Sequence, residues 1–145
     1  MEDCQLVECQ PIHASCVAIG DRGLLIIGPS CSGKSSLALE LMSRGAKLVA
    51  DDRVMLELVD DRLKASSPKA IAGKIEAREV GILKADNLPY VFVDALVNLA
   101  KTETQRLPEV HSHKILGLEL PCYYKSNTPF FPAALMQLLK AGRYA

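Results

Sequence analysis

The sequence predicts a single α/β domain over residues 1–145, with a mixed or antiparallel sheet, and three observations support this fold class. An apolar run, a glycine-rich loop and an amphipathic stretch follow one another over residues 23–45, which predicts a strand, a loop and a helix. A turn at 20–23 joins that strand to the preceding one, so the two are expected to be antiparallel neighbours. A further apolar strand, at 46–50, ends in two aspartates. With 49% hydrophobic residues, the chain can bury the core of one such domain.

Residues 28–35 have the spacing of a phosphate-binding loop, a glycine and four further residues followed by Gly-Lys-Ser. Glycines let the backbone approach a polyphosphate, and the N–H groups of the loop and of the helix N-terminus point at the anion. Lys34 is expected to reach the β- and γ-phosphates, and the Ser35 hydroxyl to contact Mg²⁺. The flanking strand and helix favour this interpretation over a glycine-rich turn without a ligand. We therefore expect a nucleotide to be bound by Gly28, Pro29, Ser30, Cys31, Ser32, Gly33, Lys34 and Ser35.

Two adjacent carboxylates, Asp51 and Asp52, end the predicted strand at 46–50 and have the form of a Walker B element. A carboxylate here can hold Mg²⁺, directly or through water, or take a proton from an attacking hydroxyl. The alternative is a solvated pair that leads into a turn. The phosphate-binding loop upstream favours the functional interpretation.

His13 begins a strand predicted at 13–19, which follows a first strand predicted at 4–9. Antiparallel pairing about the 20–23 turn brings the start of this strand to the end of the strand that enters the phosphate-binding loop. His13 is therefore expected close to the phosphates. From this pairing alone, an ordinary histidine at a strand end remains the alternative.

The rest of the chain is predicted as short strands and polar turns before a closing helix. Residues 100–113 are polar and are expected to form a surface loop that contains Arg106, His111 and His113. Two histidines at that spacing can share a metal on a strand, but without further ligands nearby a solvated loop is favoured. The other expected elements are a hairpin of 53–58 and 63–65, a loop at 68–73, a strand-like stretch at 75–83, a strand at 91–99, a pair of short strands within 115–124 and a helix at 131–139.

Charge and hydropathy argue against two classes of partner. The formal net charge is zero and no basic cluster stands out, which argues against a nucleic-acid-binding surface. Apolar runs such as residues 24–27 are far too short to cross a membrane. The N-terminus begins with acidic residues and lacks the apolar segment of a signal peptide, so a cytoplasmic protein is expected.

The five cysteines are odd in number and include no Cys-x-x-Cys pair, which suits neither a disulfide framework nor a zinc site. Reduced thiols in or near the core are expected. Cys31 differs because it lies inside the phosphate-binding loop, where positive partial charge favours an oxidisable thiolate. Redox control through Cys31 is a hypothesis that rests on this position.

Three blocks of sequence carry a resemblance to a known family. The first runs from His13 through the phosphate-binding loop to the double aspartate at 51–52. The second is Ile75-Glu76-Ala77-Arg78-Glu79-Val80-Gly81-Ile82, and the third, a weaker match, is Gln105-Arg106-Leu107. Together they cover most of residues 13–120. In order and spacing they resemble the catalytic domain of the bacterial HPr kinase/phosphorylase, which implies a P-loop kinase domain similar to the HPr kinase C-terminal domain.

The resemblance implies a protein serine kinase that uses ATP and Mg²⁺ to phosphorylate a serine of the small phosphocarrier protein HPr, or of an HPr-like protein. Because the family is known for hexamers, self-association is implied as well. Asp51, beside the residue that matches the family's base, is a further candidate for the metal. The roles carried over by position are Asp52 as general base, Lys34 as catalytic lysine, Ser35 and Glu76 as Mg²⁺ ligands, His13 as catalytic histidine and Arg106 as catalytic arginine.

Departures from the family pattern bear on activity. No residues correspond to the family's N-terminal regulatory domain, so the chain resembles a short, single-domain branch. Glu79 stands where the family signature has glycine, which adds a negative charge near the proposed metal site. The family's Pro-Val-x-Pro-Gly-Arg-Asn segment, tied to phosphorolysis, has no counterpart around 120–125, so little or no phosphorylase activity is expected. Two alternatives stay open, a nucleotide-binding sensor without phosphotransfer and a small-molecule kinase.

Overall fold

The structure is a computed structural model that describes residues 10–145, so the strand expected at 4–9 lies outside the described residues. Within residues 10–145, no helix is both long and apolar enough to cross a membrane. The elements follow in the order β1 (Gln10–Ile12), β2 (Ser15–Ile19), β3 (Arg22–Ile27), α2 (Lys34–Ser43), β4 (Lys47–Ala50), β5 (Val54–Val59), β6 (Arg62–Ser66), the 3₁₀-helix η1 (Lys69–Ile71), β7 (Lys74–Ala77), β8 (Gly81–Lys84), β9 (Val91–Thr102), β10 (His111–Ile115), β11 (Leu118–Lys125) and α3 (Phe131–Ala141).

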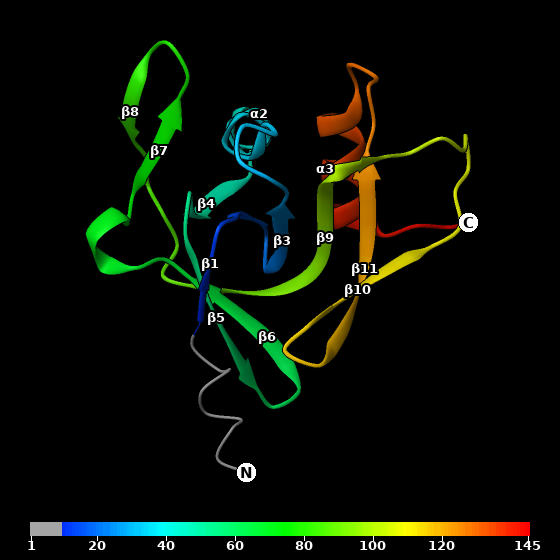
Figure 1. Cartoon of the computed structure of the whole chain (residues 1–145), viewed down its shortest axis with the longest axis horizontal. Helices are drawn as coiled ribbons and strands as arrows, with labels where there is room; N and C mark the ends of the chain where they lie inside the picture. Colours follow the sequence, from blue (N-terminus) through cyan, green and yellow to red (C-terminus); the bar gives the residue numbers. More distant parts are fainter. Residues whose placement is uncertain (1–9) are drawn as a thin grey trace.

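A curled, mixed sheet with the strand order β1-β5-β6-β9-β3-β2-β4 forms the body of the domain (Figure 1). The long strand β9 is parallel to β3 and to β11, whereas its first residues are antiparallel to β6. Strands β2 and β3 are antiparallel, with Ser15 opposite Ile26, as the turn at 20–23 predicts. The predicted α/β fold with a mixed sheet is therefore confirmed.

The central strands are buried on both faces because apolar residues follow one another along them without alternation. In β2, Cys16 and Ala18 belong to one apolar core, and Val17 and Ile19 belong to the other. The second core includes buried residues of α2 and α3, while β5, β6 and β11 contribute to the first. Each fully buried leucine in these cores contributes about 1.5–3 kcal/mol to folding. The phosphate-binding loop thus joins two elements, β3 and α2, that are anchored in one core.

Three sequence predictions are wrong in detail. The loop expected at 100–113 shortens to 103–110, because β9 continues to Thr102, where it pairs with Lys125 of β11. The last pair of strands occupies 111–115 and 118–125 rather than 115–124, because pairing in β10 begins at His111, opposite Cys122. The stretch 75–83 is a hairpin of β7 and β8 that forms its own two-stranded sheet. These strand segments contain many polar residues, so an assignment based on hydropathy does not identify them as strands.

His111 and His113 lie in β10, and the described part of the chain contains no group of three potential metal ligands. His111 instead stacks on Tyr124, with ring centroids 3.9 Å apart, and its Nε2 lies 2.9 Å from Glu103 Oε1. The hydrogen bond from His111 is the main cause that lowers the pKa of the Glu103 carboxyl. This contact ties the first residue of the 103–110 loop to its far end.

Glu79 lies in the turn between β7 and β8 with φ of 69°, in the left-handed region. This conformation suits glycine and costs a residue with a Cβ roughly 1–2 kcal/mol. We expect Glu79→Gly to raise the free energy of unfolding by about 1 kcal/mol, measured by chemical denaturation. Glu79→Ala removes the same charge but keeps the Cβ, so it should give no such gain. Equal gains in both variants would contradict this account and point to the charge instead.

Candidate active site

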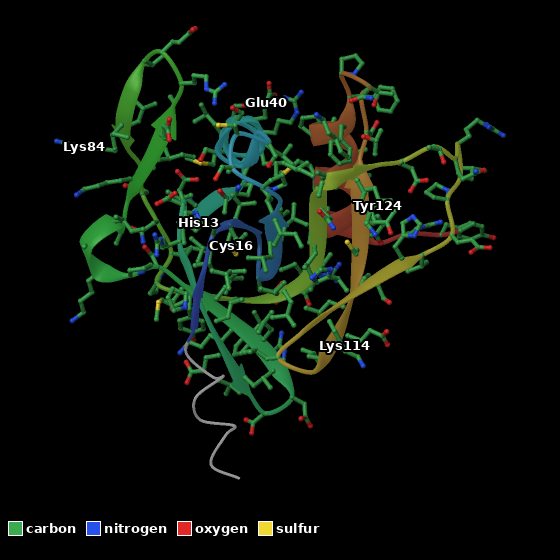
Figure 2. The ribbon with its side chains drawn as sticks, viewed as in Figure 1. His13, Cys16, Glu40, Lys84, Lys114 and Tyr124 are labelled. Carbon is green, nitrogen blue, oxygen red and sulfur yellow. The ribbon has the colours of Figure 1, made fainter. Side chains whose placement is uncertain are left out.

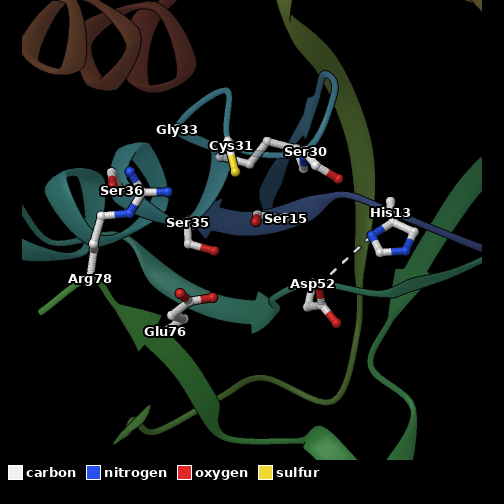
Figure 3. Close-up of a pocket in the computed structure, with 11 residues that line it drawn as sticks. His13, Ser15, Ser30, Cys31, Gly33, Ser35, Ser36, Asp52, Glu76 and Arg78 are labelled. Atoms are coloured by element: carbon white, nitrogen blue, oxygen red, sulfur yellow. Dashed lines mark ion pairs between the residues drawn. The ribbon is translucent and has the colours of Figure 1, made fainter. Parts of the chain in front are cut away.

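A cleft of about 250 Å³ opens where β3 runs into α2, between the start of β2, the end of β4 and the strand β7 (Figure 3). It lies at the position predicted from the phosphate-binding loop and the two aspartates. Glu79 is not among its lining residues, so the charge expected near the metal site does not reach it in this arrangement. The cleft is lined by His13, Ser15, Ser30, Cys31, Gly33, Lys34, Ser35, Ser36, Asp52, Glu76 and Arg78.

The phosphate-binding loop has the backbone that its glycines predict. Gly28 and Gly33 have φ values of 154° and 98°, and a Cβ on Gly28 would lie 2.7 Å from the Ser32 hydroxyl oxygen. Cys31 takes a left-handed φ of 65° despite its side chain. The Ser32 hydroxyl oxygen is buried without a protein partner. A tight, hydroxyl-rich loop of this kind, with a lysine beside it, fits an anionic polyphosphate.

Lys34 folds back over the loop that precedes it. Its Nζ donates hydrogen bonds to the carbonyl oxygens of Gly28 and Pro29, each at 2.9 Å. Both acceptors belong to the phosphate-binding loop, so the ammonium group stays at the cleft that it lines. An ammonium group held there is available to phosphate oxygens.

Asp51 lies beneath the cleft and is only 4% exposed. Its Oδ1 accepts hydrogen bonds from the hydroxyls of Ser15 and Ser35, both at 2.7 Å, and its Oδ2 accepts one from the backbone N–H of Glu76 at 3.2 Å. The carboxylate thus joins β2, α2 and β7. The sequence predicts Asp51 as a metal ligand, and these contacts place it next to one proposed ligand, Ser35, rather than among the lining residues.

The next residue, Asp52, is exposed at the cleft rather than buried beneath it. Its φ of 73° turns the backbone into the left-handed region, and its side chain is 67% exposed at the cleft. Its Oδ1 lies 3.8 Å from Nδ1 of His13, which is 58% exposed, and Figure 3 shows the two side chains facing each other. The antiparallel pairing of β2 and β3 therefore brings His13 to the cleft, as predicted.

Glu76 of β7 and Arg78, the first residue after that strand, line the cleft from the β7 side. Ile75, which precedes Glu76, and Ala77, which lies between Glu76 and Arg78, are buried instead. In Figure 3 the Glu76 carboxylate lies near Ser35. A hydroxyl and a carboxylate are oxygen ligands of the kind that Mg²⁺ takes, usually together with substrate phosphates and water. The residues present therefore fit a magnesium–nucleotide complex.

Arg106, predicted as a catalytic arginine, does not line this cleft. It belongs to the 103–110 loop and lines a separate groove of about 710 Å³ formed with β11 and α3. In Figure 2, Tyr124, which also lines that groove, lies on the β9–β11 side of the molecule, whereas His13 lies on the β2–β4 side. The structure thus brings the other predicted site residues together and leaves Arg106 apart.

Ser15 and Ser36 are cleft residues that the motifs do not single out, and Arg78 is one to which no role was given. Ser15 carries a usable signal, because it is two residues after His13 and is polar in an otherwise apolar stretch; it is also the first residue of β2, so the strand predicted at 13–19 begins two residues later. Ser36 follows the motif directly and lies in the first turn of α2. Its signal is proximity alone.

Comparison with known proteins identifies the family. The family model described as the HPr Serine kinase C-terminal domain matches residues 4–119, so the chain belongs to this family. Its fold is similar to that of the Hpr(Ser) kinase/phosphatase from Coxiella burnetii, with a TM-score of 0.76 and 25% identity, covering 90% of this chain and 94% of that one.

Curated relatives are similar over a shorter stretch. The HPr kinase/phosphorylase of Thermoanaerobacter sp. (strain X514) is 45% identical over 78 residues, which is 53% of this chain and 26% of that protein. The HPr kinase/phosphorylase of Clostridium beijerinckii is 42% identical over 77 residues, with the same coverage of 53% and 26%. The chain thus spans about a quarter of the length of these relatives.

Of the cysteines that the structure describes, only Cys31 is exposed. Burial raises the pKa of the Cys16 thiol to about 12 and also raises that of Cys122, so both stay protonated at neutral pH. We expect alkylation of Cys31 to weaken nucleotide binding by at least about tenfold, or ~1.4 kcal/mol, because the adduct fills the cleft. Equilibrium titration with a fluorescent nucleotide measures this, and bound Mg·ATP should slow the modification.

Cys31→Ser is the matched control, because it keeps the other four cysteines. Treated with the same reagent, this variant should keep its affinity. If blocked native protein binds nucleotide as well as untreated protein, the hypothesis of redox control through Cys31 is wrong.

Proposed function

We propose that the chain is an ATP- and Mg²⁺-dependent serine protein kinase whose acceptor is HPr or an HPr-like phosphocarrier protein. The observation that carries the proposal is the exposed carboxylate of Asp52, which faces the cleft beside His13 and across from the phosphate-binding loop. A loop for the donor phosphates and a free carboxylate for the acceptor are the two parts that phosphoryl transfer to a hydroxyl requires. The acceptor, HPr, is the one named for the related kinases from Thermoanaerobacter and Coxiella burnetii.

The donor side of the reaction uses the loop and its lysine. The backbone N–H groups of the phosphate-binding loop (those of residues 28–35 other than Pro29) and the ammonium group of Lys34 bind the phosphates and keep the γ-phosphoryl group at the cleft. Ser35 and Glu76 would hold Mg²⁺, with Asp51 orienting Ser35 from below. When bound, Mg²⁺ supplies neutralisation of charge on the phosphate oxygens.

The acceptor side uses Asp52 and His13. The hydroxyl oxygen of the acceptor serine attacks the γ-phosphorus, its proton passes to the Asp52 carboxylate, and ADP leaves with the electrons of the broken bond. In the reverse reaction the protonated Asp52 returns the proton. His13 lies 3.8 Å from Asp52 and orients the carboxylate. Because both side chains are more than half exposed, a serine on a large acceptor can reach them.

The proposal includes location and assembly. The proposed partners are ATP and HPr, and no nucleic acid or membrane is among them. The proposed location is the cytoplasm. Self-association and a catalytic role for Arg106 stay predictions that rest on the family resemblance.

Replacement of Asp52 tests the kinase and its base together. We expect the native protein to transfer labelled γ-phosphate from Mg·ATP to HPr, and Asp52→Asn to lower the rate by about 10²- to 10⁴-fold while nucleotide affinity is kept. Asp61→Asn is a matched control, because Asp61 is also an exposed aspartate with positive φ, 63°, but lies in the β5–β6 turn. Its rate should equal that of the native protein.

No labelled HPr from the native protein, despite tight ATP binding, would contradict the proposal. The sensor without phosphotransfer would then be favoured. A small-molecule kinase would hydrolyse or transfer phosphate with another acceptor and would still lose turnover in Asp52→Asn.

We also expect little or no phosphorolysis. With phospho-HPr and inorganic phosphate supplied, a coupled assay should detect pyrophosphate at a rate at least about tenfold below that of the kinase reaction. The reason is the missing counterpart, around residues 120–125, of the family segment tied to phosphorolysis. Pyrophosphate formation at a rate comparable to phosphorylation would overturn this expectation.

A further inference from the structure

We propose that Ser15 is a positioning residue for the metal side of the cleft. Its buried hydroxyl holds the Asp51 carboxylate in place, so that Asp51 orients the Ser35 hydroxyl rather than binding Mg²⁺ directly. The inference rests on the proposed function and deepens it, since it assigns the arrangement of groups around the metal.

Burial makes the contact between Ser15 and Asp51 exceptional within this fold. Among residues 10–145 they are the two polar or charged residues in the buried class, at 0% and 4% exposed. A buried carboxylate and a buried hydroxyl are each costly unless they are hydrogen-bonded. Their 2.7 Å hydrogen bond satisfies both, and it joins residues 36 positions apart in the chain.

The hydrogen bonds of Asp51 account for both of its oxygens. Oδ1 accepts from Ser15 and from Ser35, and Oδ2 accepts from the backbone N–H of Glu76. The three donors come from β2, the first turn of α2 and β7. A carboxylate held from three directions cannot swing toward the cleft without losing at least one of these contacts.

The single proton of the Ser35 hydroxyl decides what this arrangement does. Because Ser35 donates that proton to Asp51, the lone pairs of its oxygen are left for a cation. Ser15 lines the cleft from below and donates to the same oxygen, which keeps that oxygen aimed at Ser35. Without Ser15, the carboxylate keeps the donors Ser35 and Glu76 N–H but loses the buried one, so Oδ1 is held less firmly against Ser35. Outer groups that orient metal ligands in this way affect metal affinity by about 10–100-fold.

The neighbouring residue offers a matched control. Cys16 is on the same strand and is also fully buried, but its side chain belongs to the core formed with β5, β6 and β11 and makes no hydrogen bond to Asp51. Its hydrogen bond goes to the carbonyl oxygen of Val17. Cys16→Ala therefore disturbs β2 as a structural element and leaves the contacts of Asp51 intact.

The test measures equilibrium binding of ADP with Mg²⁺ and with EDTA, together with the thermal midpoint of each variant. For Ser15→Ala we expect the enhancement of ADP affinity by Mg²⁺ to fall by about tenfold, with the affinity in EDTA unchanged. Ser15→Thr restores a hydroxyl and should recover most of the enhancement. Cys16→Ala should lower the thermal midpoint and keep the native enhancement.

Two results would overturn the inference, native enhancement in Ser15→Ala or an equal loss in Cys16→Ala. If Ser15→Ala does not fold, Ser15→Val is compared with Ser15→Thr, because the two side chains have nearly the same shape and only threonine can donate a hydrogen bond; native enhancement in Ser15→Val would likewise count against the inference. A failure of HPr phosphorylation would overturn the proposed function. It would not affect the test of Ser15, because the Mg²⁺ enhancement of ADP affinity is measured without an acceptor.

Discussion

The buried carboxylate of Asp51 is the interaction on which the site depends. It accepts hydrogen bonds from Ser15, Ser35 and the backbone of Glu76, which are far apart in sequence and belong to a strand, a helix and a separate hairpin. A carboxylate taken out of water is stabilised only when such donors replace its hydration. The same contacts that satisfy the charge therefore fix the distance between the phosphate-binding loop and β7, across which a metal–nucleotide complex would lie.

Backbone strain separates the roles of the two adjacent aspartates. In an ordinary extended strand they would alternate faces, but here the strand ends and Asp52 enters the left-handed region at φ 73°. A left-handed residue with a Cβ is strained by roughly 1–2 kcal/mol, and such strain clusters at functional sites. Cys31, at φ 65° in the phosphate-binding loop, is a second case. Both line the cleft, whereas the other left-handed residues with a Cβ, Asp60, Asp61, Glu79 and Leu116, lie in the turns of hairpins.

Local patterns predicted the elements whose chemistry is local. The phosphate-binding loop, the antiparallel pair β2–β3 and the place of His13 follow from spacing and turn type, and the structure has them. The strand predicted at 91–99 is present as β9, but its extension to Thr102, the strand β10 and the pairing of β7 with β8 were not predicted, because pairing partners rather than hydropathy decide them. The turn between β7 and β8 has Glu79 in the left-handed region, where a glycine would be typical, so the sequence does not indicate a turn there. The role of Ser15 depends on a carboxylate 36 residues away, which no local pattern contains.

The position of Arg106 limits how positive charge can reach the transferring phosphoryl group. Its loop is tied by Glu103 to His111, which stacks on Tyr124, and it lines a groove on the other side of β9 from the cleft. Among residues 10–145 of one chain, the lysine and arginine that line the cleft are therefore Lys34, from the loop, and Arg78, just after β7. A contribution from Arg106 to the same reaction requires that the 103–110 loop move or that a second copy of the chain present it. Lys34 and Arg78 flank the position of Ser35 and Glu76, so charge neutralisation and metal binding are built into the same pair of elements.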